Sequence, residues 1–167
     1  MQARRFLLAL FSLTLAACYP RQPVAPPPAP PPPPPAPTLT EEDAARARLQ
    51  RAERFFDEGV SLGRQSRWAE AADRYRLASE ANPNEPRYPL ALAEALLSQG
   101  RDWEAADALL AGIRVEERRQ SPNHRVLAVD YERLIRLLTR LNRLDEARLA
   151  QEQQSYHRRL RDAATPE

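Results

Sequence analysis

Apolar residues in positions 40–167 recur at the spacing of one face of an α-helix. The clearest example is the stripe formed by Tyr131, Leu134, Ile135 and Leu138. The chain has only 4 glycines, and this part of it has almost no runs of the β-branched residues that favour strands. We therefore expect this part of the chain to be all-α.

Helix-start signals mark the beginning of this region. Thr40-x2-Asp43 is an acidic variant of a capping box, a pattern typical of a helix N-terminus. No helix breaker lies between Glu41 and Glu58, so the first helix is predicted to run for about six turns.

An internal repeat relates the predicted helices. The first unit starts at Ala52 and continues with Phe55-x2-Glu58-Gly59-x2-Leu62, then Ala71-x3-Tyr75, Ala78 and Pro83. These offsets resemble the 34-residue tetratricopeptide pattern of an aromatic, a small residue, a large residue, an alanine, an aromatic and a closing proline. The resemblance implies two helices per unit, stacked unit upon unit.

Two further units follow, one starting near Pro86 and a more divergent one near Ala128. Trp68 and Trp103 are 35 residues apart, which predicts one extra residue in the turn around Gly100. Leu144-Asp145-Glu146-Ala147 repeats Trp68-Ala69-Glu70-Ala71, but Leu144 follows Trp103 by 41 residues, and the excess is assigned to a loop or helix start within Glu116–Asn123. The sequence thus predicts a short array of about three helix pairs.

The last predicted helix, from about Leu144 to Arg161, follows a helix stop at Asn142. It carries Gln151 and Gln154 where the first two units have apolar residues. A polar outer face is required at the end of a stacked array, since no further repeat covers it.

The N-terminus has the pattern of a bacterial export signal. Arg4 and Arg5 precede an apolar run that is too short to cross a bilayer, and Leu15-Ala16-Ala17-Cys18 resembles a lipobox. The resemblance implies cleavage after residue 17 and lipid attachment at Cys18, the single cysteine. Tyr19, rather than aspartate, implies transfer to the periplasmic face of the outer membrane. The alternative is an ordinary secretory signal with Cys18 as an incidental thiol.

A proline-rich linker separates this signal from the helical region. Residues 19–39 contain 12 of the 17 prolines in the chain. Polyproline II geometry at about 3.1 Å per residue gives a semi-rigid reach of roughly 65 Å. The stretch could instead be a ligand for a proline-recognising module. The expected organisation is a signal peptide at 1–17, a lipidated, disordered linker at 18–39 and a helical domain at 40–167.

Charge does not indicate nucleic-acid binding. Three of the 25 basic residues, Arg4, Arg5 and Arg21, precede the helical region, which leaves 22 arginines against 23 acidic residues. A nucleic-acid-binding domain would show a basic patch or stripe.

Nothing in the sequence indicates catalysis. His124 and His157 are 33 residues apart and neither has a metal-ligand companion three or four residues away. The chain has no glycine-rich phosphate loop and no nucleophile elbow. We expect no enzymatic activity, no cofactor and no bound metal, so that function resides in a binding surface.

The concave side of a tetratricopeptide array is lined by the first helix of each unit, where partners commonly bind. The resemblance implies a lining of Phe56, Val60, Arg64, Leu90, Glu94, Leu97, Glu132, Arg136 and Arg140. Relatives that grip a terminal carboxylate have lysine and asparagine where this chain has Phe56 and Val60, so chaperone-tail recognition is not expected. The alternative is that Phe56, Leu90 and Leu97 belong to the core.

A lipid anchor, a proline-rich stalk and a small tetratricopeptide domain together resemble the Lpo-type outer-membrane lipoproteins that activate bifunctional penicillin-binding proteins. The resemblance implies a protein that reaches through the peptidoglycan to such a synthase, and we expect it to be a monomer. Two alternatives remain open: a pilotin or assembly lipoprotein for an outer-membrane secretin, and a passive structural tether.

Overall fold

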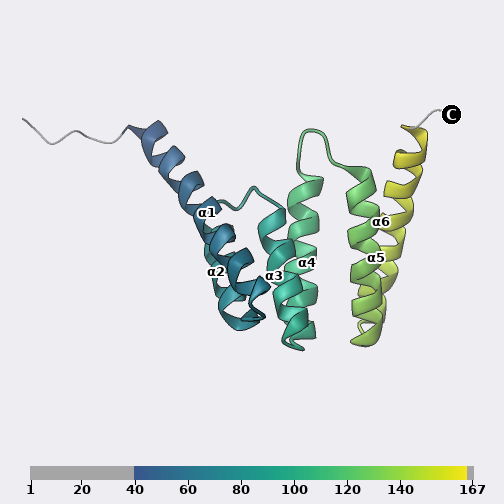
Figure 1. The fold of residues 1–167 in the computed structure, drawn as a ribbon. Coiled ribbons are helices and arrows are strands. Elements are labelled where there is room, and N and C mark those ends of the chain that lie inside the picture. The colour runs from purple at the N-terminus through teal and green to yellow at the C-terminus, as the bar shows by residue number, and fades with distance from the viewer. Residues whose placement is uncertain (1–39, 165–167) are drawn as a thin grey trace, which may run out of the picture. The chain divides into compact units, whose positions relative to one another are not determined.

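The computed structural model describes residues 40–164, which form six α-helices (Figure 1). The helices are α1 (Glu41–Arg64), α2 (Trp68–Ala81), α3 (Arg87–Ser98), α4 (Asp102–Glu117), α5 (His124–Arg140) and α6 (Leu144–Ala163). Each helix packs on the next, and the closest packing is within the pairs α1–α2, α3–α4 and α5–α6. The predicted all-α fold with three helix pairs is confirmed.

The predicted signal peptide, Cys18 and the proline-rich linker lie outside the described residues. Within residues 40–164, no helix combines the length and the apolar character needed to cross a bilayer.

The first helix begins as predicted. The Thr40 hydroxyl accepts a hydrogen bond from the Asp43 backbone N–H at 3.2 Å and donates to the Asp43 carboxylate at 2.7 Å. Glu41 and Glu42 add negative charge to the first turn, which favours a helix start. α1 then runs for 24 residues, in agreement with the expected six turns.

The three turns inside the helix pairs share one geometry. Their central residues, Ser66, Gly100 and Asn142, all have positive φ, at 60°, 72° and 57°. Because Ser66 and Gly100 are 34 residues apart, the extra residue predicted around Gly100 is absent. The prediction was wrong because Trp68 is the first residue of α2, whereas Trp103 is the second residue of α4.

An arginine fork follows each turn. The residue before the second helix of each pair is an arginine, and its Nε donates to a glutamate three residues later. The pairs are Arg67–Glu70, Arg101–Glu104 and Arg143–Glu146, with Nε–Oε1 distances of 2.6, 2.7 and 2.7 Å. The fork lowers the pKa of each glutamate. The first two pairs are exposed and add little stability, whereas the Arg143 side chain is only 16% exposed; together the three pairs identify equivalent positions in the helix pairs.

A small residue lies at the same place in each pair, one position after the fork glutamate. Ala71, Ala105 and Ala147 are 0%, 0% and 4% exposed. In the first pair, Gly59 of α1 faces the Tyr75 ring so closely that a Cβ at Gly59 would lie 2.6 Å from a ring carbon. Small side chains therefore set the close approach of the helices within a pair.

The extra length before the third pair lies only in part where the sequence placed it. The loop at 118–123 is one residue longer than the loop at 82–86, whereas α4 has 16 residues against 14 in α2 and α5 has 17 against 12 in α3. α4 ends at Glu117 and α5 begins at His124. The buried Glu116 carboxylate accepts the Asn123 backbone N–H at 2.8 Å, and the Asn123 side chain caps α5 by accepting from Val126 N–H at 3.1 Å. The loop is thus fixed at both ends by hydrogen bonds.

The final helix is polar on its outer face only in part. Gln151 is exposed, and Gln154 donates to the Ala128 carbonyl at 3.3 Å. Leu149 and Tyr156, however, are 61% and 48% exposed. The prediction of a polar face therefore missed these two exposed apolar side chains.

Candidate protein-binding groove

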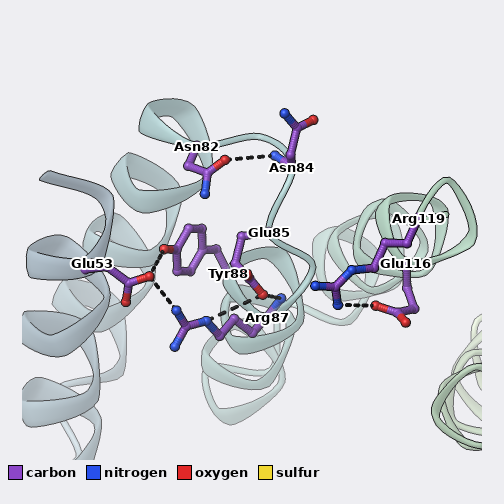
Figure 2. Close-up of polar contacts among 8 residues, drawn as sticks. All are labelled: Glu53, Asn82, Asn84, Glu85, Arg87, Tyr88, Glu116 and Arg119. Atoms are coloured by element: carbon purple, nitrogen blue, oxygen red, sulfur yellow. Dashed lines mark hydrogen bonds and ion pairs between the residues drawn. The ribbon is translucent and has the colours of Figure 1, made fainter. Parts of the chain in front are cut away.

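Polar contacts link the first and second helix pairs (Figure 2). Glu53 of α1 accepts a hydrogen bond from the Tyr88 hydroxyl at 2.8 Å and pairs with the Arg87 guanidinium, both on α3. Burial and then the Glu53 hydrogen bond raise the pKa of Tyr88 to about 12. Figure 2 also shows Arg119 paired with Glu116 on α4.

Phe56 is packed into the junction between the first two pairs. Its ring centroid lies 5.6 Å from that of Tyr75 and 5.3 Å from that of Tyr88, and the Arg87 guanidinium lies 5.0 Å from the ring. Val60 packs on the same hydrophobic cluster. Arg64 is exposed at the end of α1. Phe56 and Val60 therefore have core partners at this junction.

The junction between the second and third pairs contains an open groove of about 290 Å³ between α3 and α5. Its apolar lining is Leu90, Ala93 and Leu97 of α3, Leu109 of α4 and Leu137 of α5. Its charged lining is Glu94, Arg133, Arg136 and Arg140. We call this the α3–α5 groove. Five of the nine residues expected on the concave side line it: Leu90, Glu94, Leu97, Arg136 and Arg140.

Three arginines line the α5 side of this groove. Arg133 pairs across the groove with Glu94 at 3.4 Å. Arg136 pairs with Glu132 at 3.4 Å, and Arg140 pairs with Asp102 at 3.0 Å. The side chains of Arg136 and Arg140 are 70% and 61% exposed. Exposed pairs of this kind are weak, so these guanidinium groups can exchange their partners for a ligand carboxylate at small cost.

Gly112 of α4 lies against Leu90, one of the groove residues. A Cβ at Gly112 would lie 2.6 Å from Leu90 Cδ2 and 2.7 Å from Leu90 Cγ. Leu90 therefore packs directly on the α4 backbone. Leu90 was predicted from the sequence, whereas Gly112 and Arg133 were not. Arg133 is one turn before the predicted Arg136, so the helical period was the signal that could have found it.

A buried acid lies beside the groove. Asp130 is 5% exposed, and its one ion pair among the described residues is with Arg133, at 3.8 Å. Burial raises the pKa of Asp130, and Arg133 offsets this only in part.

The fold brings together the two histidines that the sequence separates by 33 residues. Their Nδ1 atoms are 3.0 Å apart, and His157 Nε2 is 3.3 Å from Glu117, which also accepts from the Tyr131 hydroxyl at 2.7 Å. All three contacts are satisfied if His124 Nδ1–H donates to His157 and His157 Nε2–H donates to Glu117. His157 is 4% exposed, so the cluster has a structural place between α4, α5 and α6.

Over residues 40–164, no group of three or more histidine, cysteine, aspartate or glutamate side chains is arranged to hold a metal ion. Comparison of the chain with models of known protein families gives no match, and comparison with curated proteins gives none either. The geometry of the site therefore carries the functional argument.

Proposed function

We propose that this chain is a tetratricopeptide-type binding module, held at the periplasmic face of the outer membrane by lipid on Cys18, that activates a bifunctional penicillin-binding protein in peptidoglycan synthesis. The recurring turns, arginine forks and small residues support the repeat assignment. The lipobox and proline-rich stretch support the anchor and stalk. We propose a monomer that binds protein and does not bind nucleic acid.

The observation that carries the binding proposal is the α3–α5 groove. Four leucines and Ala93 form its apolar lining, and Arg136 and Arg140 present exposed guanidinium groups along one wall. Such a groove is suited to a protein segment that combines apolar side chains with carboxylates. Anchor and stalk would confine it near its partner, so that a weak contact acts at a high effective concentration.

The test is stimulation of a purified bifunctional penicillin-binding protein that polymerises lipid-linked glycan. The full chain, in nonionic detergent, is expected to raise the polymerisation rate. Leu97→Glu and Arg136→Glu should reduce the stimulation without lowering the unfolding midpoint, because both side chains are exposed. Arg148→Glu is the matched control, since Arg148 is an exposed arginine outside the groove lining.

Other results would select another function. Binding to a secretin tail with unchanged polymerisation would indicate a pilotin. No effect on either would indicate a passive tether. Saturation of the synthase without any change in polymerisation or crosslinking, with groove variants equal to wild type, would refute the activator proposal.

The stalk is proposed to act by its length. Deleting residues 26–35 removes about 30 Å at 3.1 Å per residue, whereas scrambling them keeps the reach. Deletion should abolish function in cells and the scramble should retain it. Equal loss in both would indicate that the stalk acts as a sequence motif.

A further inference from the structure

A second groove lies on a different face of α5. It runs between α4 and α6, has a volume of about 410 Å³ and shares no lining residue with the α3–α5 groove. Leu134 and Leu138 of α5 line it together with Leu110 of α4 and Leu149 of α6. We call it the α4–α6 groove. Mostly apolar concavities of this size are typical of binding sites.

The arginine forks allow the two junctions to be compared position by position. Leu110 follows Arg101 by nine residues, as Arg76 follows Arg67. Leu149 follows Arg143 by six residues, as Asp107 follows Arg101. At the junction of the first and second helix pairs, these two positions are Arg76 and Asp107. At the junction of the second and third pairs, both are leucines.

Leu110 packs in part against the hydrophobic core, but Leu149 is not explained by packing within the fold. Leu149 is 61% exposed, although the equivalent Asp107 shows that a charged residue is compatible with this position. Trp103 is 58% exposed, and its ring lies 5.3 Å from the guanidinium of Arg143, which lines the groove. Exposed leucine and tryptophan beside a concave apolar surface indicate an interface.

One cation in this groove is available for a ligand. Arg114 is exposed and makes no hydrogen bond or ion pair within residues 40–164. Arg143, by contrast, is held by Glu146 and Asp107. Charge complementarity therefore favours an occupant that places a carboxylate against Arg114.

The walls of the groove restrict which backbone conformation an occupant can adopt. These are helices, whose backbone groups already bond within each helix, so an extended peptide would find few partners for its N–H and C=O groups. An amphipathic helix satisfies its own backbone and presents an apolar face. The chain's own residues 19–39 contain no aspartate or glutamate and cannot supply a carboxylate.

We propose that the α4–α6 groove docks an amphipathic helix of a partner protein, with leucine-like side chains against Leu110 and Leu149 and a carboxylate against Arg114. This proposal is independent of the function proposed for the α3–α5 groove.

The test uses a displayed library of 18-residue helices with a fixed leucine stripe and flanking positions randomised among glutamate, glutamine and arginine. It is selected against the full chain in nonionic detergent, with detergent alone as the blank. We expect enrichment of glutamate at a flanking position with the wild type. Arg114→Glu should shift the enrichment to arginine, and Leu149→Asp should weaken the binding of the selected peptide at least about tenfold, measured by fluorescence anisotropy.

Between the first two helix pairs, the position equivalent to Arg114 is Glu80 and the position equivalent to Leu149 is Asp107. Arg114→Glu and Leu149→Asp therefore each introduce the residue found at the equivalent position. Arg136→Glu, in the other groove, is the control and should bind like the wild type. The proposal is overturned if enrichment equals the blank or if neither variant changes it. It is also overturned if sedimentation shows a dimer that Leu149→Asp dissociates, because the occupant would then be a second copy of this chain. Displacement of the selected helix by a peptide of residues 19–39 would overturn it as well.

Discussion

Substitution of Gly59 tests the packing of the first helix pair. The Cβ of Gly59→Ala would lie 2.6 and 2.8 Å from two ring carbons of Tyr75, where carbon atoms normally approach to about 3.5 Å or more. The ring would have to move by roughly 1 Å, and it is also in contact with Phe56, three residues before Gly59 on α1, with 5.6 Å between ring centroids. Overpacking of this kind costs about 1 to 3 kcal/mol, against a gain of about 1 kcal/mol in helix propensity. The expected net loss is about 0 to 2 kcal/mol.

Gly63 provides a matched control in the same helix. It is also buried, but the nearest atom to its added Cβ is Trp68 Cζ3 at 3.2 Å, and the next is at 3.7 Å. Trp68 is half-buried and can move by the few tenths of an ångström required. Gly63→Ala gains the same helix propensity with little overpacking, so it should be as stable as the wild type or up to about 1 kcal/mol more stable.

The measurement is thermal unfolding of the full chain followed by circular dichroism at the helix signal. For a helical domain of this size, 1 kcal/mol corresponds to about 3 to 5 °C. The midpoints of the two ranges differ by about 1.5 kcal/mol, so Gly59→Ala is expected to unfold about 6 °C below Gly63→Ala. If Gly59→Ala is as stable as Gly63→Ala, the close approach of α1 to Tyr75 is not what holds the pair together.

Three further predictions concern other parts of the chain. Burial raises the pKa of Asp130, so its ionisation costs folding stability as pH rises through that pKa. Asp130→Asn should therefore raise the unfolding midpoint at about pH 7 and have no effect at about pH 3. Equal effects at both pH values would exclude ionisation as the cause. Glu116→Ala leaves the Asn123 N–H without its acceptor and should cost about 1 to 3 kcal/mol in denaturant unfolding, whereas Glu116→Gln should retain most of the stability. Cys18→Ser should abolish labelling with a radioactive fatty acid and leave an uncut precursor, and continued labelling would contradict lipid attachment at Cys18.

The helices were predictable because their signals are local. The Thr40 cap, the stripe on α5 and the small residue Gly59 each act within a few residues or within one helix pair. The arginine forks were equally accessible, since Arg-x2-Glu recurs after each turn, and aligning on them instead of on tryptophan would have given the correct 34-residue spacing from Arg67 to Arg101.

The form of the groove was not predictable, because it depends on how one helix pair packs on the next. Phe56 occupies the helix position expected to line the concave side, but Arg87 and Tyr88 of the next pair cover it. Leu90, at the equivalent position, lines an open groove, and at this junction α5 packs less extensively on α4 than α3 does on α2. The contact between His124 and His157 likewise joins two helices, and no local pattern encodes it.

The difference between the two junctions has a consequence for the order in which the chain opens. Glu53, Arg87 and Phe56 seal the first junction, whereas the second has a groove on each of two faces of α5. In stacked arrays, stability is the sum of each unit and its interface with the next. The α5–α6 hairpin should therefore detach as a separate cooperative unit, and its amide hydrogens should exchange with solvent through a lower-energy opening than those of α1 to α4.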